Sequence, residues 1–274
     1  MWGAVGGGAP HPTFATAVPA IAAEGWDGVV VALIALEFEP GIGSLPELAE
    51  RCDQSGLDLA FMVMTDGADA AAHADSFRRE IERVAPLEPH HVIVHDGRDF
   101  FAPAEASAYY RAVAEMEADL GFPVAHETHR SRILFTPWAT RRVLDEFPDL
   151  RLAVDLSHWM VVAERFLDDE LETIRAAGAR MIHLDARVGH EEGPQVPDPA
   201  APEWGEHVAA FETWWEAAIE ARRAVDPDAV VVVVPEYGPP PYQQTLPHTG
   251  MPTTDLWDMT RAARDRFESR FPNL

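Results

Sequence analysis

The sequence predicts a single (β/α)8 barrel spanning residues 1–274, and three observations point to this fold. Short β-branched runs alternate with longer amphipathic segments, a pattern typical of parallel strands joined by helices. A chain of 274 residues suits one barrel, which takes about 250 residues. The glycines at residues 6–8 lack the spacing of the phosphate-binding turn of an open doubly wound sheet, so the barrel is favoured over that alternative.

Eight strands are expected, and the first of them is short and weakly marked. In chain order the strands are expected near Ala4–Val5 and at Val29–Leu33, Asp58–Met64, His91–His95, Pro123–Glu127, Arg151–Asp155, Met181–Asp185 and Val230–Glu236. With a helix after each strand, these runs supply the repeating units of a barrel.

The helices between the strands begin and end at recognisable residues. Ser44 is expected to cap one helix, with proline in the first turn, and Gly56 to end it. Thr136, followed by proline, marks another start. Asp255 is expected to open a last helix that ends near Phe271.

Two connections, residues 188–207 and 238–254, are long and rich in proline and glycine. Loops of this length in a compact domain are usually functional lids or partner surfaces, and family-specific decoration is the alternative. Both follow strands, so we expect them over the C-terminal face of the barrel, where barrel enzymes keep their chemistry.

The charge balance excludes some partners and reactions. The 46 acidic and 21 basic residues give a net charge of -25, and no basic stripe appears, so we expect no nucleic-acid partner. The chain contains no lysine, so all 21 basic residues are arginine. Mechanisms that need a Schiff base on lysine are therefore excluded.

Cysteine usage and the N-terminal segment indicate the compartment. Cys52 is the only cysteine, so no internal disulfide can form, which suits a reducing environment. Residues 1–8 lack the basic flank and apolar run of a signal peptide, and no apolar stretch of 18 residues occurs. We expect a cytoplasmic protein with no membrane partner.

Four predicted strands end on, or next to, a side chain that can bind a metal ion: Glu127, Asp155, His183 and Glu236. Strand ends converge in a closed barrel, so we expect these four residues to hold one divalent metal ion. Each acid alone could instead cap the following helix, but one shared explanation is favoured because buried charges without a partner are costly. The oxygen-rich set suits Mn²⁺, the ion we expect, and also Mg²⁺ or Co²⁺, and Zn²⁺ could occupy it.

Further side chains near these strand ends are expected to bind the substrate: His158, Arg187, His129, Arg130 and His95. His158 can orient a substrate hydroxyl or carbonyl oxygen, with a surface histidine as the alternative. Arg187 and Arg130 can hold a hydroxyl, carboxylate or phosphate with a bidentate fork, or form ordinary ion pairs.

Strand alternation assigns other residues to one face or the other. Asp185 shares a face with His183 and is expected to be its hydrogen-bond partner. His126 must point away from Glu127, so we expect it between the sheet and the helices. Asp96 is expected to line the pocket without binding metal.

The sequence resembles the xylose-isomerase-like TIM barrels of the sugar phosphate isomerase/epimerase superfamily over most of its length, most strongly at residues 124–238. In that family a Glu, an Asp, a His and a second Glu on successive strand ends hold a metal ion, and a substrate-binding His follows the Asp by three residues. The matching positions in order are Glu127, Asp155 with His158 in Asp-Leu-Ser-His, His183 in Ile-His-Leu-Asp, and Glu236 in Pro-Glu-Tyr-Gly.

Two departures leave the substrate open. Ile133 stands where many ketose epimerases of the group have another glutamate, and Arg187 stands slightly nearer to the metal-binding His than their arginine does.

The resemblance implies an enzyme of carbohydrate metabolism, a metal-dependent isomerase or epimerase that acts on a sugar or related hydroxy-carbonyl compound through an enediolate. The metal ion would lower the pKa of the C–H bond beside the carbonyl. Glu127 and Glu236 would act as proton acceptor and proton donor. The partner is then a small carbohydrate, and a homodimer is a further expectation because barrels of this group often pair.

Three alternatives stay open. The same site could serve a lyase or hydratase that acts on a 3-oxo-glycoside or keto-acid. An endonuclease would need a multi-metal site with more histidines, and the acidic charge argues against it. A non-catalytic barrel could retain the metal ion for structure alone.

Overall fold

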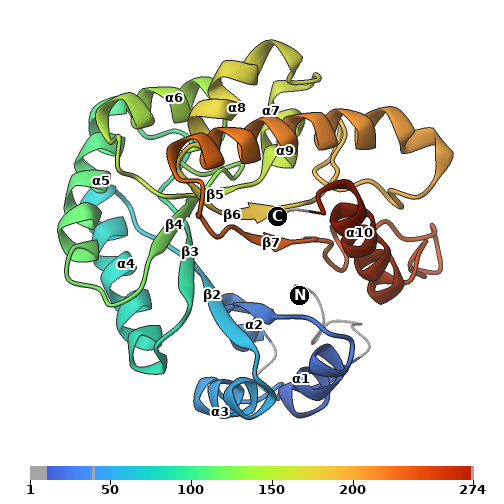
Figure 1. Ribbon diagram of the computed structural model, residues 1–274. Helices are drawn as coiled ribbons and strands as arrows, with labels where there is room; N and C mark the ends of the chain where they lie inside the picture. The colour runs from blue at the N-terminus through green and yellow to red at the C-terminus, as the bar shows by residue number, and fades with distance from the viewer. Residues whose placement is uncertain (1–10, 39–40, 273–274) are drawn as a thin grey trace.

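The computed structural model describes residues 11–38 and 41–272, which form a curled parallel sheet surrounded by helices (Figure 1). Within these residues the sheet has seven strands, hydrogen-bonded to one another in chain order. The strands are β1 (Gly28–Ala32), β2 (Asp58–Met64), β3 (His91–His95), β4 (Val124–Glu127), β5 (Leu152–Val154), β6 (Met181–Asp185) and β7 (Val232–Val234).

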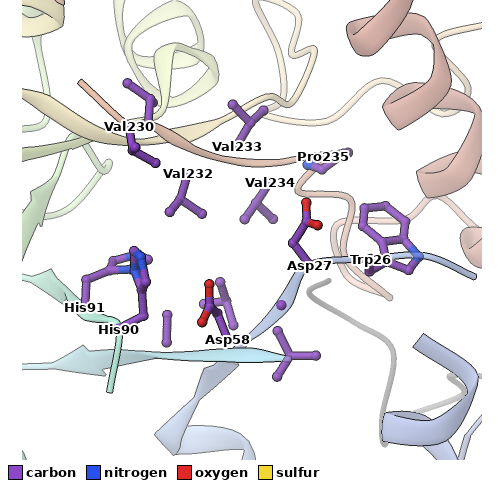
Figure 2. Close-up of a pocket in the computed structure, with 15 residues that line it drawn as sticks. Trp26, Asp27, Asp58, His90, His91, Val230, Val232, Val233, Val234 and Pro235 are labelled. Carbon is purple, nitrogen blue, oxygen red and sulfur yellow. The ribbon is translucent and has the colours of Figure 1, made fainter. Parts of the chain in front are cut away.

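Seven of the eight predicted strands are confirmed to within two residues at each end. The predicted first strand near Ala4–Val5 lies outside the described residues. The described part of the chain is therefore an α/β barrel-like fold with seven strands. A cavity of about 320 Å³ lies between β1 and β7, with Trp26, His90 and His91 among its lining residues (Figure 2).

Both faces of the sheet are buried, which explains why its strands read as apolar runs. Successive side chains of a strand point to opposite faces. Small and medium side chains, including Ile93, Ala125 and Ala153, form a compact cluster separate from the larger core. Their neighbours Val92 and Val94 belong to the larger core, which includes buried residues of the surrounding helices. The first cluster therefore marks the interior of the curled sheet.

Helices follow the strands and cover the outer face of the sheet (Figure 1). They are α1 (Phe14–Ala23), α2 (Leu33–Phe38), α3 (Leu45–Ser55), α4 (Ala70–Val84), α5 (Pro103–Glu117), α6 (Pro137–Glu146), α7 (Leu156–Ala163), α8 (Leu171–Gly178), α9 (Gly205–Val225) and α10 (Leu256–Arg270), with 3-10 turns at Ala85–Leu87, Asp168–Glu170 and Pro202–Trp204. No helix of the described residues is long and apolar enough to cross a membrane.

The helix ends predicted from sequence are confirmed by their capping geometry. The hydroxyl of Ser44 accepts a hydrogen bond from the third amide of α3, and Gly56 ends that helix with a left-handed φ of 67°. Thr136 caps α6 in the same way. Asp255 caps α10, which ends at Arg270 beside the predicted Phe271.

The two long connections follow β6 and β7. The first reaches the 3-10 turn Pro202–Trp204 and then α9, so the predicted loop 188–207 ends a few residues early. The buried side chain of Gln195 joins the two connections, because its oxygen accepts from the Gly238 amide at 2.8 Å and its nitrogen donates to the Gly238 carbonyl at 3.2 Å. The loops are therefore fixed to each other.

Helices α8 and α9 approach each other closely, which explains a glycine at the last position of α8. A Cβ atom added at Gly178 would lie 2.4 Å from the Cα atom of Ala218. We expect Gly178→Ala to lower the free energy of unfolding by about 1–3 kcal/mol, because overpacking forces the helices apart. Urea denaturation of the purified protein measures this change.

Gly205, the first residue of α9, is the matched control because an added Cβ would meet nothing within 4 Å. Gly205→Ala should leave stability unchanged or raise it by up to about 1 kcal/mol. Equal effects of the two substitutions would contradict the packing argument.

Candidate active site

Four carboxylates lie at the C-terminal ends of neighbouring strands. Glu127 and Asp185 are the last residues of β4 and β6, Asp155 follows β5 directly, and Glu236 lies two residues beyond β7. All four are buried, with at most 4% of each residue exposed. Three of them follow a residue of the interior cluster by two positions, so alternation directs them into the barrel. The strand order then brings them together at one end of the sheet.

Arg187 is the positive charge among these carboxylates. Its buried guanidinium donates to the Asp155 carboxylate and lies 3.1 Å from the Oε2 atom of Glu236. It also donates to the Nε2 atom of His158 at 2.9 Å, and its Nε atom donates to the Ser157 hydroxyl. Burial opposes the charge of Arg187, but the two carboxylates outweigh it and raise its pKa.

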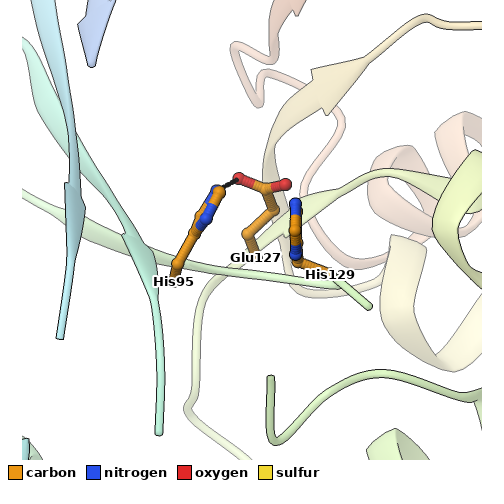
Figure 3. Close-up of side chains that lie close together, drawn as sticks. All are labelled: His95, Glu127 and His129. Carbon is orange, nitrogen blue, oxygen red and sulfur yellow. Dashed lines mark hydrogen bonds and ion pairs between the residues drawn. The ribbon is translucent and has the colours of Figure 1, made fainter. Parts of the chain in front are cut away.

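Three imidazoles, those of His95, His129 and His158, stack beside the carboxylates. The ring centroids are 4.2 Å apart between His95 and His129 and 3.8 Å apart between His129 and His158. Burial lowers the pKa of His95 to about 3 and the pKa values of the other two well below their usual range, so the rings are neutral. His95 can donate through Nε2 to the Oε2 atom of Glu127 at 2.5 Å (Figure 3).

His183 lies deeper in the barrel than the four carboxylates, and both of its ring nitrogens have partners. Its Nε2 atom is 2.9 Å from Asp185, the hydrogen-bond partner expected from the sequence. Its Nδ1 atom is 2.9 Å from Nε2 of His91, which lines the cavity between β1 and β7. Burial raises the pKa of Asp185 and the nearby carboxylates of Glu127 and Asp155 raise it further, while Asp155 also acts on the pKa of His183.

Two groups of side chains in the described residues could hold a metal ion. His95, Glu127 and His129 form one group, and Glu127, Asp155 and His158 form the other. Within each group one ligand atom of every residue lies within 4.8 Å of the others, and Glu127 is common to both. Of the residues predicted from sequence, these groups contain Glu127, Asp155, His95, His129 and His158. His183, Asp185 and Glu236 belong to neither group.

The carboxylates are short of positive charge, which fits a bound cation. Burial raises the pKa values of Glu127, Asp185 and Glu236 well above their usual range, although Arg187 opposes the rise in each case. The Oε1 atom of Glu127 and the Oδ2 atom of Asp185 are buried and accept no hydrogen bond from the described part of the chain. Buried oxygens of this kind are typical ligands of Mn²⁺ or Mg²⁺.

The long connection after β7 brings a side chain that the sequence did not single out. The half-buried ring of Tyr242 lies 5.0 Å from the guanidinium of Arg187 and 5.4 Å from that of Arg130. Tyr242 therefore links this loop to the strand ends that carry the two arginines. No sequence signal marked it, because the proline-rich loop has no periodicity.

His126 is confirmed between the sheet and the helices, where it forms a buried ionic cluster. Its ring nitrogens lie 2.8 Å from Asp96 and 2.9 Å from Glu117 of α5. Asp96 also accepts from the hydroxyl of Tyr109 in α5, so it faces the helices and not the pocket where the sequence placed it. Alternation explains the difference, since Asp96 follows the inward-facing His95.

A family model for xylose isomerase-like TIM barrels matches residues 18–217 of the chain. The chain belongs to this family. The resemblance noted from the sequence is thereby confirmed. No curated protein sequence matches the chain.

Solved structures share the fold of this xylose isomerase-like barrel at low sequence identity. A probable 3-DHS dehydratase, AsbF, involved in petrobactin synthesis from Bacillus anthracis has a TM-score of 0.58 and 13% identity, with 93% of each chain covered. Endonuclease IV from Thermus thermophilus has a TM-score of 0.58 and 15% identity, covering 93% of this chain and 94% of its own.

A xylose isomerase domain protein from Alicyclobacillus acidocaldarius has a TM-score of 0.54 and 17% identity, covering 93% of this chain and 92% of its own. At these identities the three matches establish the fold alone. The chemistry of this chain has to be argued from its own site.

The cluster around His126 makes stability depend on pH. Burial lowers the pKa of His126, but Asp96 and Glu117 outweigh it and raise the pKa to about 10 from 6.5. Because the pKa of His126 is higher in the folded state, its protonated ring stabilises the fold fully below about pH 6.5. This stabilisation is lost as the pH rises towards 10. Urea denaturation at several pH values between these limits should show the loss.

Asp96→Asn should lower the free energy of unfolding by about 3 kcal/mol at pH 7, because it leaves a buried imidazolium with one carboxylate. It should also weaken the pH dependence. The control Asp75→Asn removes an exposed ion pair with Arg78 and should change stability by less than about 1 kcal/mol. An unaltered pH profile in Asp96→Asn would show that His126 is not the titrating group.

Proposed function

We propose that this protein is a divalent-metal-dependent isomerase or epimerase that acts on a sugar or a related hydroxy-carbonyl compound. One observation carries the proposal: four buried carboxylates lie at the mouth of the barrel, and the guanidinium of Arg187 pairs with two of them, Asp155 and Glu236. The negative charge of the four carboxylates exceeds the positive charge of Arg187, so the site can bind a divalent cation. It lies at the C-terminal strand ends, where barrel enzymes bind their substrates.

The proposed metal ligands are Glu127, Asp155, Asp185 and Glu236, with His158 beside them. The sequence assigned the β6 ligand to His183, and the hydrogen bonds at both nitrogens of His183 favour Asp185 instead. In this arrangement His183 orients the Asp185 carboxylate. A bound divalent ion would supply Lewis-acid polarisation of a substrate carbonyl, which makes the neighbouring C–H bond more acidic.

Glu127 and Glu236 are proposed to move the proton. They come from β4 and β7, with β5 and β6 between them in the sheet. Burial raises the pKa of each, which brings a carboxylate closer to the strength that a general base needs near neutral pH. One glutamate takes the proton from the carbon beside the carbonyl, and the other returns a proton to the reacting atoms.

The remaining residues would hold and orient the substrate. Neutral His95 and His158 each have a buried Nδ1 atom without a hydrogen-bond partner, so they can bind substrate hydroxyls. Arg187 holds Asp155 and Glu236 in place through its guanidinium. The small-carbohydrate partner follows from this proposal, whereas cytoplasmic location and homodimer formation stay predictions from the sequence.

Proton exchange gives the first test. With Mn²⁺ and an accepted keto-sugar in ²H₂O, one deuterium should enter the product at the carbon beside the carbonyl, as detected by mass spectrometry and NMR. A product free of deuterium would count against an exchanging proton. A product lighter than the substrate by a leaving group, or heavier by one water, would instead identify the lyase or the hydratase reaction.

Glu236→Gln separates catalysis from structure. Assayed at a Mn²⁺ concentration that saturates the metal site, the variant should lose at least about a hundredfold in turnover, because general acid and base groups contribute this much. The control Glu203→Gln alters an exposed residue and should keep full activity. If Glu236→Gln greatly lowers thermal stability, and neither the wild-type protein nor the variant turns over substrate, the metal site would be structural and not catalytic.

Metal affinity distinguishes Asp185 from His183 as the ligand. Asp185→Asn should weaken Mn²⁺ binding by more than about a hundredfold, and His183→Asn by about tenfold, because partners of metal ligands contribute less than the ligands themselves. Calorimetric titration of the metal-free proteins measures both. The opposite order would restore the assignment made from the sequence.

A further inference from the structure

We infer that the substrate carries an anionic group, a carboxylate or a phosphate, which binds the guanidinium of Arg130 at the mouth of the barrel. The inference rests on the proposed function, since it concerns the far end of the substrate bound at the same site. It narrows the substrate class to sugar acids and phosphorylated sugars.

Arg130 is half-buried and has no acidic partner among the residues that the structure describes. Most arginines of the described residues pair with Asp or Glu, as Arg51 does with Glu47 and Arg141 with Asp145. Among the described residues the side chain of Arg130 makes no hydrogen bond or ion pair, and its guanidinium lies over the face of Tyr242. Removing a cation partly from water without a counter-charge is costly, so an anion from outside the chain would stabilise it.

Tyr242 fixes the place where such an anion would bind. Arg130 and Arg187 both lie against its ring, at 5.4 and 5.0 Å from the centroid. The charge of Arg187 is already offset by Asp155 and Glu236. The charge of Arg130 is not, and the aromatic face holds its guanidinium without neutralising it. Of the two, Arg130 is therefore the residue left to bind a ligand.

The position of Arg130 matches one end of an extended substrate. It stands three residues after Glu127, just beyond the end of β4. A substrate whose carbonyl lies among the carboxylates can therefore reach Arg130 with its other end. The planar fork of arginine suits carboxylate and phosphate oxygens, which accept two parallel hydrogen bonds.

The negative net charge of the chain strengthens the argument that Arg130 binds an anion. A charge of -25 repels anions at long range, so an acidic substrate needs a dedicated cation at the mouth. A neutral sugar would need none. An arginine at the mouth without an acidic partner among the described residues thus favours an acidic ligand over an uncharged one.

The test compares three matched five-carbon ligands on the Mn²⁺-loaded protein: arabinitol, arabinonate and arabinitol 5-phosphate. In calorimetric titration at low salt, at least one acidic ligand should bind about tenfold or more tightly than the polyol, as a charge-assisted contact implies. Its affinity should fall with added salt, while that of the polyol should not. Which acid binds better identifies carboxylate or phosphate as the group.

Substitution assigns the effect to Arg130. Arg130→Gln should weaken binding of the preferred acid by about tenfold or more, and leave the polyol affinity and the Mn²⁺ content unchanged. Arg142→Gln is the control, because Arg142 is exposed on α6, and it should change none of these values.

Two results would overturn the inference: equal affinities of the wild-type protein for the polyol and both acids, or an equal effect of Arg130→Gln on all three ligands. Either could occur while the protein still isomerises a neutral keto-sugar, which would leave the proposed function standing. Conversely, if the protein binds acids through Arg130 but takes up no metal ion, the anion site would be supported and the proposed metal-dependent isomerase would be contradicted.

Discussion

The accumulation of four buried carboxylates near the buried guanidinium of Arg187 is the constraint on which the rest of the structure depends. Unpaired buried charges are costly, so each carboxylate needs its own support. Asp155 accepts from the Ser157 amide at 2.8 Å, Glu127 lies 2.5 Å from His95, and Asp185 lies 2.9 Å from His183. These contacts fix the carboxylates in place before any ligand binds, which is what a preorganised site requires.

The surrounding fold maintains this arrangement from two sides. Below the site, His91 and His183 form a hydrogen-bonded connection through the interior, from the cavity between β1 and β7 to Asp185. Above it, Gln195 ties the two long loops together, and Tyr242 lies against the arginines at the strand ends. The carboxylates therefore lie between the His91–His183 pair and a loop that contacts the arginines at the strand ends.

The sequence predicted the strands and the convergence of their ends because strand periodicity and parallel topology fix both. Glu127 and Asp155 were found in this way. The sequence assigned the β6 metal ligand to His183 and made Asp185 its hydrogen-bond partner, although both residues share one face of β6 and periodicity alone does not separate their roles. The pairing of β5 with β6 also shifts register between Leu152 and Ala153, which leaves no trace in composition. Tyr242 was missed because the conformation of its loop depends on tertiary contacts.

The most direct test of the account is an anomalous difference map, measured at the manganese absorption edge, from crystals grown with Mn²⁺. The expected result is a strong peak enclosed by the carboxylates of Glu127, Asp155, Asp185 and Glu236. A map with no peak among these side chains, or with its peak elsewhere, would contradict the account.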